Sequence, residues 1–222
     1  SWADNPKELR IFRTINRRIA GNTIGIIGFG NIGKAFASRI RGFGPKSIIA
    51  YDPYLEQTTA DLYGVELVSL DQLLTQSDFI TLHAPSTEET HHIIDSEAIS
   101  KMKVSAILIN CARGPLVDPK ALYTALKDGY ISSAAIDVTE VEPINSEDPL
   151  LTLDNLIITP HTAGSSSVSR IEGSKRQAEN VIRILTGGTP HGLVNPEVIK
   201  TITVNRHQGD KRWEGFKEFQ LP

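Results

Sequence analysis

TIGIIGFGNIG, residues 23–33, is the stretch that decides the fold of this chain. Its first five residues predict a short buried strand, and G-x-G-x-x-G follows at once and opens a predicted helix. In that setting Gly28 allows a tight turn, Gly30 lets a pyrophosphate approach the backbone, and Gly33 lets the helix pack close to the sheet. The stretch therefore predicts a dinucleotide-binding turn.

Asp52 supports this interpretation, because it follows Gly33 by 19 residues and ends the next predicted strand. A carboxylate at that place accepts hydrogen bonds from the adenosine ribose hydroxyls and repels a 2′-phosphate, which favours NAD over NADP. The alternative is that the glycines only permit a turn and that Asp52 caps a helix. The succession of strand, glycines, helix and acid favours NAD as the cofactor.

Strands and helices alternate along most of the chain. The alternation predicts an α/β fold with a doubly wound parallel sheet. Predicted strands cover 23–27, 47–51, 79–83, 106–110, 134–138 and 156–159, and predicted helices cover 32–41, 70–76, 96–102, 118–127 and 165–185.

The domain organisation follows from the same pattern. We predict a dinucleotide-binding domain over residues 23–192. Residues 1–22 are interpreted as a linker or dimer-contact segment, and residues 193–222 as a C-terminal return segment and tail.

Composition excludes several classes of function. The 222 residues are 40% apolar and 22% charged, which suits a folded, soluble protein with its own core. No apolar run approaches the roughly 18 residues of a membrane span, and a net charge of −3 offers no basic face to nucleic acid. The single cysteine, Cys111, favours a cytoplasmic location, and no paired Cys or His spacing indicates a metal site.

Three residues with acid–base or ion-pair chemistry follow the last three predicted strands: Arg113, Glu142 and His161. Because parallel strands end at one edge of a sheet, these side chains should converge. A nicotinamide enzyme that acts on a 2-hydroxy or 2-keto acid needs such a set. Arginine grips a carboxylate through two hydrogen bonds, histidine exchanges a proton near neutral pH, and an acid orients the histidine.

Each of these residues also has a structural interpretation. A lone arginine usually lies on a solvated face, and a histidine after a proline can cap a helix. Glu142 shares its acidic loop with Glu140, Glu147 and Asp148, so spacing alone does not single it out. His83 either lines the cofactor pocket or is a satisfied loop histidine. Structural roles only are assigned to His91, His92, His191 and His207, and no catalytic role is assigned to Cys111.

Five sequence motifs resemble those of the D-isomer-specific 2-hydroxyacid dehydrogenases, over a stretch from about Gly21 to Pro196. The resemblance implies hydride transfer between NAD(H) and a D-2-hydroxy acid or 2-keto acid. It also implies Arg113, Glu142 and His161 as catalytic residues and Asp137 as the contact of the nicotinamide carboxamide. The motifs are GFGNIG (28–33), YDP (51–53), INCARGPLVD (109–118), AAIDVTEVEPI (134–144) and ITPHTAG (158–164).

The cofactor contacts that we predict on this basis lie in the loops after the strands, and no metal ligand is among them. They are Gly28, Gly30, Asn31, Ile32, Gly33, Asp52, His83, Ala84, Pro85, Cys111, Ala112, Arg113, Asp137, His161, Ala163 and Gly164.

One departure from the family pattern leaves the function open. Family members usually insert this domain into a substrate domain whose loops close the cleft, and we expect that substrate domain to be largely absent from this chain. Three functions remain: an NAD-dependent dehydrogenase, an NAD(H)-sensing binding module similar to the C-terminal binding protein corepressors, and an inactive truncated paralogue. The resemblance also implies a homodimer with a small-molecule substrate.

Overall fold

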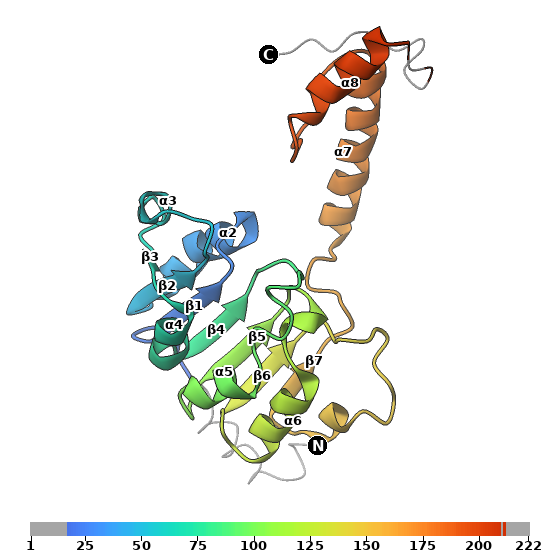
Figure 1. Ribbon diagram of the computed structural model, residues 1–222. Helices are drawn as coiled ribbons and strands as arrows, with labels where there is room; N and C mark the ends of the chain where they lie inside the picture. The colour runs from blue at the N-terminus through green and yellow to red at the C-terminus, as the bar shows by residue number, and fades with distance from the viewer. Residues whose placement is uncertain (1–16, 210, 212–222) are drawn as a thin grey trace. The chain divides into compact units, whose positions relative to one another are not determined.

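The computed structural model describes residues 17–209 and 211, and in that part of the chain it forms one parallel sheet. The strands are β1 (Thr23–Ile27), β2 (Ser47–Tyr51), β3 (Glu66–Leu67), β4 (Phe79–Leu82), β5 (Ile107–Asn110), β6 (Ser133–Ile136) and β7 (Leu156–Ile158). Their order is β3-β2-β1-β4-β5-β6-β7 (Figure 1). The order reverses between β1 and β4, so the predicted doubly wound α/β fold is confirmed.

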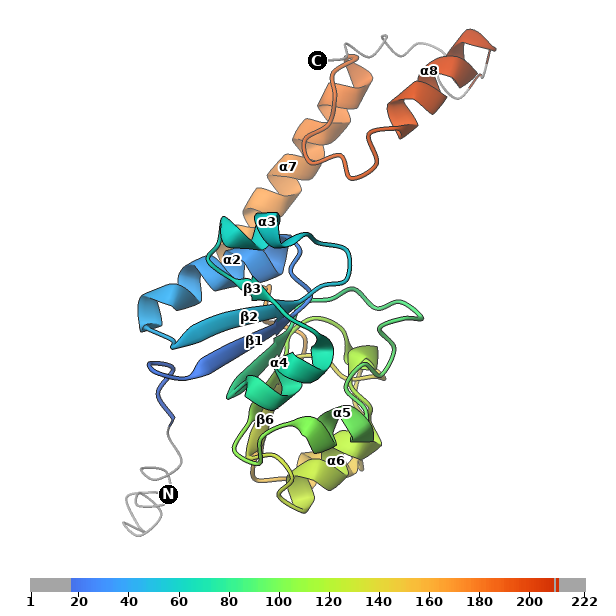
Figure 2. The same ribbon diagram turned by 60° about the vertical axis from the view of Figure 1, so that its left-hand side comes forward.

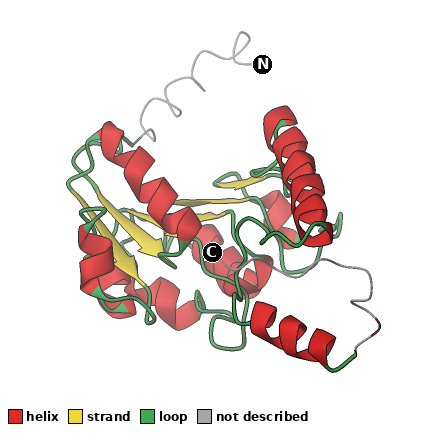
Figure 3. Ribbon diagram, turned by 90° about the horizontal axis from the view of Figure 1, so that it is seen from above, coloured by secondary structure: helices red, strands yellow, loops and turns green. Residues whose placement is uncertain are grey.

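Helices cover both faces of this sheet. On one side lie α2 and α3, and on the other lie α4, α5 and α6 (Figure 2); Figure 3 shows the yellow strands between the red helices. The bounds are α2 (Asn31–Ile40), α3 (Gln57–Asp61), α4 (Leu70–Gln76), α5 (Ser96–Lys101) and α6 (Pro119–Lys127), with 3-10 turns η1 (Arg41–Phe43), η2 (Gly114–Leu116) and η3 (Pro149–Thr152).

The alternation of side chains along β1 divides the core into two clusters. Ile24 and Ile26 pack with Ala37 of α2. Ile27 points to the opposite face and belongs to the cluster that contains Leu73 and Leu74 of α4. Because β1 is buried on both faces, its sequence is a nearly continuous apolar run, as central parallel strands require.

Local capping explains why two predicted helices begin where they do. Ser69 and Gln72 form a reciprocal capping box at the start of α4. Asp118 accepts hydrogen bonds from the amides of Lys120 and Ala121 at the start of α6. These side chains satisfy amides that the first helical turn leaves without partners, and they fix the loops that precede each helix.

The predicted strands and helices are present with small changes at their ends. The strand expected over 134–138 is β6, which ends at Ile136, so Asp137 lies just beyond it. Likewise β4 ends at Leu82 and leaves His83 outside the strand. The two-residue strand β3 and the five-residue helix α3 were not predicted, because neither is long enough to show a periodic pattern.

Residues 164–209 and 211 belong to a second compact unit. It contains α7 (Ser167–Leu185), which begins at a capping box of Ser166 and Ser169, and α8 (Val198–His207), which was not predicted. The predicted domain end at residue 192 stays a prediction, and most of the predicted segment 1–22 lies outside the described residues. None of the described helices is both long and apolar enough to span a bilayer.

The sheet core generates a first prediction. Ile80→Ala should lower the free energy of unfolding by about 2–5 kcal/mol, because Ile80 is fully buried in β4 and the truncation leaves a cavity. Ile157→Ala is the matched control, since Ile157 lies in β7 with 66% of its surface exposed. It should cost less than about 1 kcal/mol. Urea unfolding of both variants measures the difference, and equal losses would contradict this assignment of the core.

Candidate active site

The glycine-rich turn leaves open space in front of the first turn of α2. Gly28 has φ of 87°, and a Cβ there would lie 2.5 Å from the amide nitrogen of Ala84, so only glycine fits. A Cβ on Gly33 would lie 2.4 Å from the carbonyl oxygen of Gly28. A Cβ on Gly30 would meet no atom within 4 Å. The first turn of α2 has neither a side-chain cap nor an acidic residue. The amides at this end of α2 therefore suit a phosphate.

Asp52, directly after β2, stabilises this turn by hydrogen bonding. Its Oδ2 accepts a hydrogen bond from the amide of Phe29 at 2.8 Å, and its Oδ1 accepts one from the amide of Tyr54 at 3.1 Å. Glu56 occupies the N-cap position of α3, so Asp52 is not a helix cap. Each carboxylate oxygen can accept a further hydrogen bond, so Asp52 can also accept hydrogen bonds from ribose hydroxyls.

A cavity of about 480 Å³ opens beside Asp52. Gly28 forms part of its wall, together with Ala84 and Pro85 from the loop after β4. The Tyr54 hydroxyl donates a hydrogen bond to Glu89 across this cavity, so two loops meet over it. The cavity has the place and size expected for the adenosine half of a dinucleotide. The sequence did not indicate Tyr54 or Glu89, because neither belongs to a recognisable motif.

His83 directly follows β4 and is partly buried. Its ring packs against Phe36 with 5.3 Å between ring centroids, and its Nε2 lies 3.2 Å from the Thr81 hydroxyl. Burial lowers the pKa of His83, which favours the neutral ring. These contacts fit a satisfied loop histidine, while its contact with a cofactor stays a prediction.

His161 and Glu142 form the central pair of the candidate active site. The Nδ1 of His161 lies 2.8 Å from Oε2 of Glu142, and the amide of Thr139 donates to the other carboxylate oxygen at 3.2 Å. The hydrogen bond with His161 is the main cause that lowers the pKa of Glu142. The two side chains remain 55% and 40% exposed. A cavity of about 510 Å³ adjoins the pair, so it is open to a small molecule.

A buried carboxylate holds the loop that carries His161. Asp137 accepts hydrogen bonds from the Thr159 hydroxyl, from the amide of Thr162 at 2.9 Å and from the amide of Ala163 at 2.8 Å. Burial alone would raise the pKa of Asp137, but these hydrogen bonds lower it below its ordinary value. His161 has φ of 55°, a left-handed conformation that a non-glycine residue adopts only when its surroundings impose it.

Arg113 lies on the neighbouring loop, after β5. The side chain of Asn110 shapes this loop by donating to the carbonyl of Arg113 at 2.9 Å and accepting from the amide of Ala112 at 3.0 Å. The exposed guanidinium donates one hydrogen bond, of 2.6 Å, to the carbonyl of Ala112. At Gly114 a Cβ would lie 1.9 Å from the carbonyl oxygen of Thr139, so this loop packs directly on the loop of Glu142.

Cys111 does not resemble a nucleophile. Partial desolvation and the charge of Asp137 raise the pKa of its thiol, which disfavours the thiolate. The structure therefore brings together His161, Glu142 and Asp137, with Arg113 on an adjoining loop outside the lining of the cavity beside the pair. The threonines around Asp137 were missed by sequence reasoning, although both flank His161 in the motif ITPHTAG.

Known proteins are similar to this chain over most of its length. Residues 5–163 match the model of the D-isomer-specific 2-hydroxyacid dehydrogenase NAD-binding domain. Glyoxylate reductase of Korarchaeum cryptofilum is 47% identical over 182 residues, which are 82% of this chain and 54% of that protein. D-3-phosphoglycerate dehydrogenase of Methanocaldococcus jannaschii is 47% identical over 176 residues, 79% of this chain and 33% of that protein.

Solved structures give the same grouping. Apo D-mandelate dehydrogenase of Rhodotorula graminis superposes with a TM-score of 0.75 at 31% identity, covering 83% of this chain and 54% of that one. D-lactate dehydrogenase of Lactobacillus jensenii with NAD⁺ superposes with a TM-score of 0.71 at 28% identity, covering 82% and 59%. The chain thus spans about half the length, or less, of the curated relatives it matches.

The hydrogen bonds of Asp137 generate a second prediction. Asp137→Asn should lower the free energy of unfolding by about 1–3 kcal/mol near pH 7, because an NH₂ group would face an amide donor. Folding lowers the pKa of Asp137 below its ordinary value, so its ionic contribution is fully present above the ordinary pKa and is lost as the pH falls through the folded pKa.

Urea unfolding of parent and variant at about pH 7 and about pH 3 tests this sign. The difference between the two proteins should shrink at the acidic pH. A difference that is equal at both values would show that the charge of Asp137 contributes nothing. Glu147→Gln is the control, because Glu147 is exposed, and it should change little at either pH.

Proposed function

Because the chain belongs to the D-isomer-specific 2-hydroxyacid dehydrogenases, through their NAD-binding domain, we propose that it is the cofactor-binding part of such an enzyme. The reaction would transfer a hydride between NAD(H) and a D-2-hydroxy acid or 2-keto acid. The observation that carries this proposal is the 2.8 Å hydrogen bond between His161 and Glu142. This proton-transfer pair lies at the carboxyl edge of the same parallel sheet whose β1 leads into the glycine-rich turn.

The residues at and beside the glycine-rich turn fit the pyrophosphate and the adenosine half of an NAD molecule. The amides at the start of α2 face open space at Gly30 and would bind the pyrophosphate. Asp52 would accept hydrogen bonds from the adenosine ribose hydroxyls within the cavity beside it. NAD supplies hydride acceptance and donation at its nicotinamide ring. The remaining predicted contacts, Asp137 with the carboxamide among them, form part of this proposal.

His161 would exchange the proton. Its Nδ1 is engaged with Glu142, so Nε2 is the nitrogen left to face a substrate oxygen. During reduction Nε2–H donates a proton to the carbonyl oxygen, and during oxidation Nε2 takes the proton of the hydroxyl. Glu142 holds the ring in this tautomer and balances the charge of the protonated ring.

Arg113 would bind the substrate carboxylate. One of its guanidinium nitrogens is used by the carbonyl of Ala112, which fixes the direction of the side chain. The other donors remain for a two-point contact with a carboxylate. Since this loop packs on Thr139, whose amide bonds Glu142, the position of Arg113 is coupled to that of the His161–Glu142 pair.

The whole enzyme would need residues beyond this sequence. At 55% exposure His161 faces water, which weakens the electrostatic interactions that proton and hydride transfer use. We propose that a substrate domain closes the cleft over His161 and Arg113 and selects the side chain of the substrate. A homodimer in the cytoplasm is part of the proposal. The free thiol of Cys111 supports this location, and sedimentation measures the oligomeric state.

The third prediction concerns the variant His161→Gln, assayed in the full-length gene product. The variant should lower kcat for reduction of 2-keto acids such as glyoxylate by about 10²–10⁴-fold, because no group remains to give the proton. The affinity for NADH should change less than about threefold. His191→Gln is the control, since His191 lies in the second unit. NAD binding by the parent without turnover of any 2-keto acid would instead favour an NAD(H)-sensing module.

Asp52→Asn supplies the fourth prediction, measured by calorimetry on this chain. Loss of the carboxylate charge should weaken NAD binding by at least about tenfold, and NADP binding by less, because the 2′-phosphate no longer meets a negative charge. The preference for NAD over NADP should therefore fall. Asp128→Asn, an exposed acid at the end of α6, should leave both affinities unchanged. An unaltered preference in the Asp52 variant would remove Asp52 from the cofactor site.

A further inference from the structure

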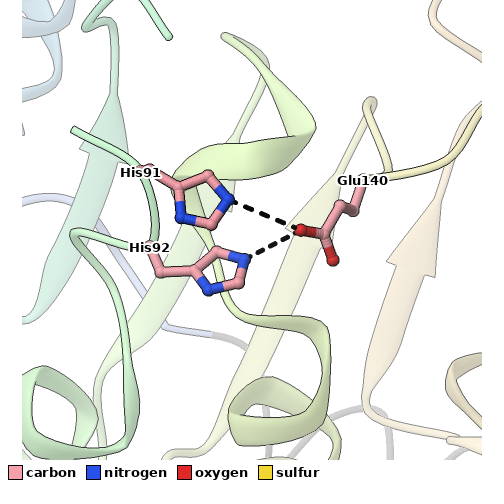
Figure 4. A group of neighbouring side chains, drawn as sticks. All are labelled: His91, His92 and Glu140. Atoms are coloured by element: carbon pink, nitrogen blue, oxygen red, sulfur yellow. Dashed lines mark hydrogen bonds and ion pairs between the residues drawn. The ribbon is translucent and has the colours of Figure 1, made fainter. Parts of the chain in front are cut away.

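A cluster of two histidines and a glutamate lies apart from the His161–Glu142 pair. Figure 4 shows the rings of His91 and His92 side by side, with one nitrogen of each directed at the same oxygen of Glu140. The distances to Glu140 Oε1 are 2.9 Å from Nε2 of His92 and 3.8 Å from Nε2 of His91. The three ligand atoms all lie within 4.8 Å of one another. We propose that this cluster binds a divalent transition-metal ion of the Zn²⁺ class.

The spacing of the three atoms fits such an ion. With bonds of about 2.0–2.1 Å in a tetrahedral site, neighbouring ligand atoms lie about 3.4 Å apart. The two distances from Nε2 to Glu140 Oε1, 2.9 Å and 3.8 Å, lie on either side of that value. The rings stack with 3.9 Å between centroids and 29° between planes, so the side chains must rotate before both Nε2 lone pairs converge on one ion. Two imidazoles and one carboxylate are a ligand set that zinc accepts.

The backbone holds His92 in place before any ion arrives. His92 has φ of 50°, and its amide donates to the carbonyl of Pro115 at 2.8 Å. Ile94, two residues further on, is fully buried and forms a bridge with Val117. A left-handed histidine beside a ligand cluster is strain of the kind that functional sites retain. The site would therefore be preorganised at His92.

Glu140 is positioned by a separate loop. It follows Thr139, whose carbonyl packs on Gly114 and whose hydroxyl donates to the carbonyl of Val141 at 2.8 Å. Glu140 and His92 are 32% and 28% exposed, and His91 is 54% exposed. The cluster therefore keeps an open side toward solvent, where water would complete the coordination of the ion.

Binding at this site would join two loops of the candidate cofactor cleft. The histidines end the loop whose residues Thr87 to Thr90 line the cavity beside Asp52. Glu140 shares its loop with Glu142, the partner of His161. An ion would clamp these loops together, whereas a hydrogen bond from His92 to Glu140 joins them more weakly. This inference does not rest on the proposed dehydrogenase activity.

Calorimetric titration of Zn²⁺ into this chain, freed of any affinity tag and of metal, tests the site. We expect one ion per chain, with binding weakened at least about tenfold in Glu140→Gln and in the double variant His91→Gln/His92→Gln. Matched controls are Glu147→Gln in the same acidic loop and His191→Gln in the second unit, and both should bind as the parent does. His161→Gln tests the other histidine–carboxylate pair and should also bind normally.

A second readout guards against variants that fold poorly. Co²⁺ replaces Zn²⁺ in tetrahedral sites and gives them a visible absorption, which the parent and the three controls should show and the cluster variants should lack. His91→Cys should restore a ligand and add a sulfur-to-cobalt band. The proposal is overturned if the parent binds no stoichiometric ion, if binding survives both cluster variants, or if His161→Gln is the variant that abolishes it. None of these readouts requires NAD binding or turnover.

Discussion

Parallel strand pairing is the constraint on which this structure depends. Because every neighbouring pair in the sheet is parallel, all strands end at one edge. The sequence can therefore place the glycine-rich turn, Asp52, Arg113 and His161 on separate loops and still gather them along that edge. Buried isoleucines and leucines on both faces keep the strands in register. The loops only have to position side chains over short distances, which is a task for local hydrogen bonds.

Asp137 positions the loop that carries His161. A carboxylate with 3% exposure would be costly without partners, and it finds three donors within the segment 159–163. The same bonds draw the chain around His161 into a left-handed turn, which directs its Nδ1 to Glu142. Two of the three donors are backbone amides, so an apolar residue at position 137 would leave them unsatisfied. The buried charge thus fixes the orientation of an exposed histidine.

The sequence predicted those parts of the molecule whose cause is local. The stretch 23–33 contains a strand, the glycine-rich turn and the start of a helix. The starts of α4 and α6 carry their own capping residues. The short β3 and α3 were missed because β3 depends on its pairing with β2 and α3 on its contact with β3, and neither is long enough to show a periodic pattern. The partners of Asp137 were missed for a related reason, since a pattern of residue types does not say which amides a buried carboxylate meets.

The partners of the acidic loop after β6 are the remaining part of the site that the sequence could not predict, because they lie far away along the chain. Sequence spacing alone did not separate Glu142 from Glu140, Glu147 and Asp148 as the partner of His161, but the structure distinguishes Glu142 from Glu140. Glu142 meets His161 and Glu140 meets His92, 48 residues away. Alternate residues of an extended segment point to opposite sides, so two acids that are two positions apart would be expected to share a side. The bond between the Thr139 hydroxyl and the Val141 carbonyl turns the chain between them and breaks that rule. One short turn therefore gives the two glutamates different histidine partners, and with them different chemistry: a pair suited to moving a proton and a cluster suited to holding a cation.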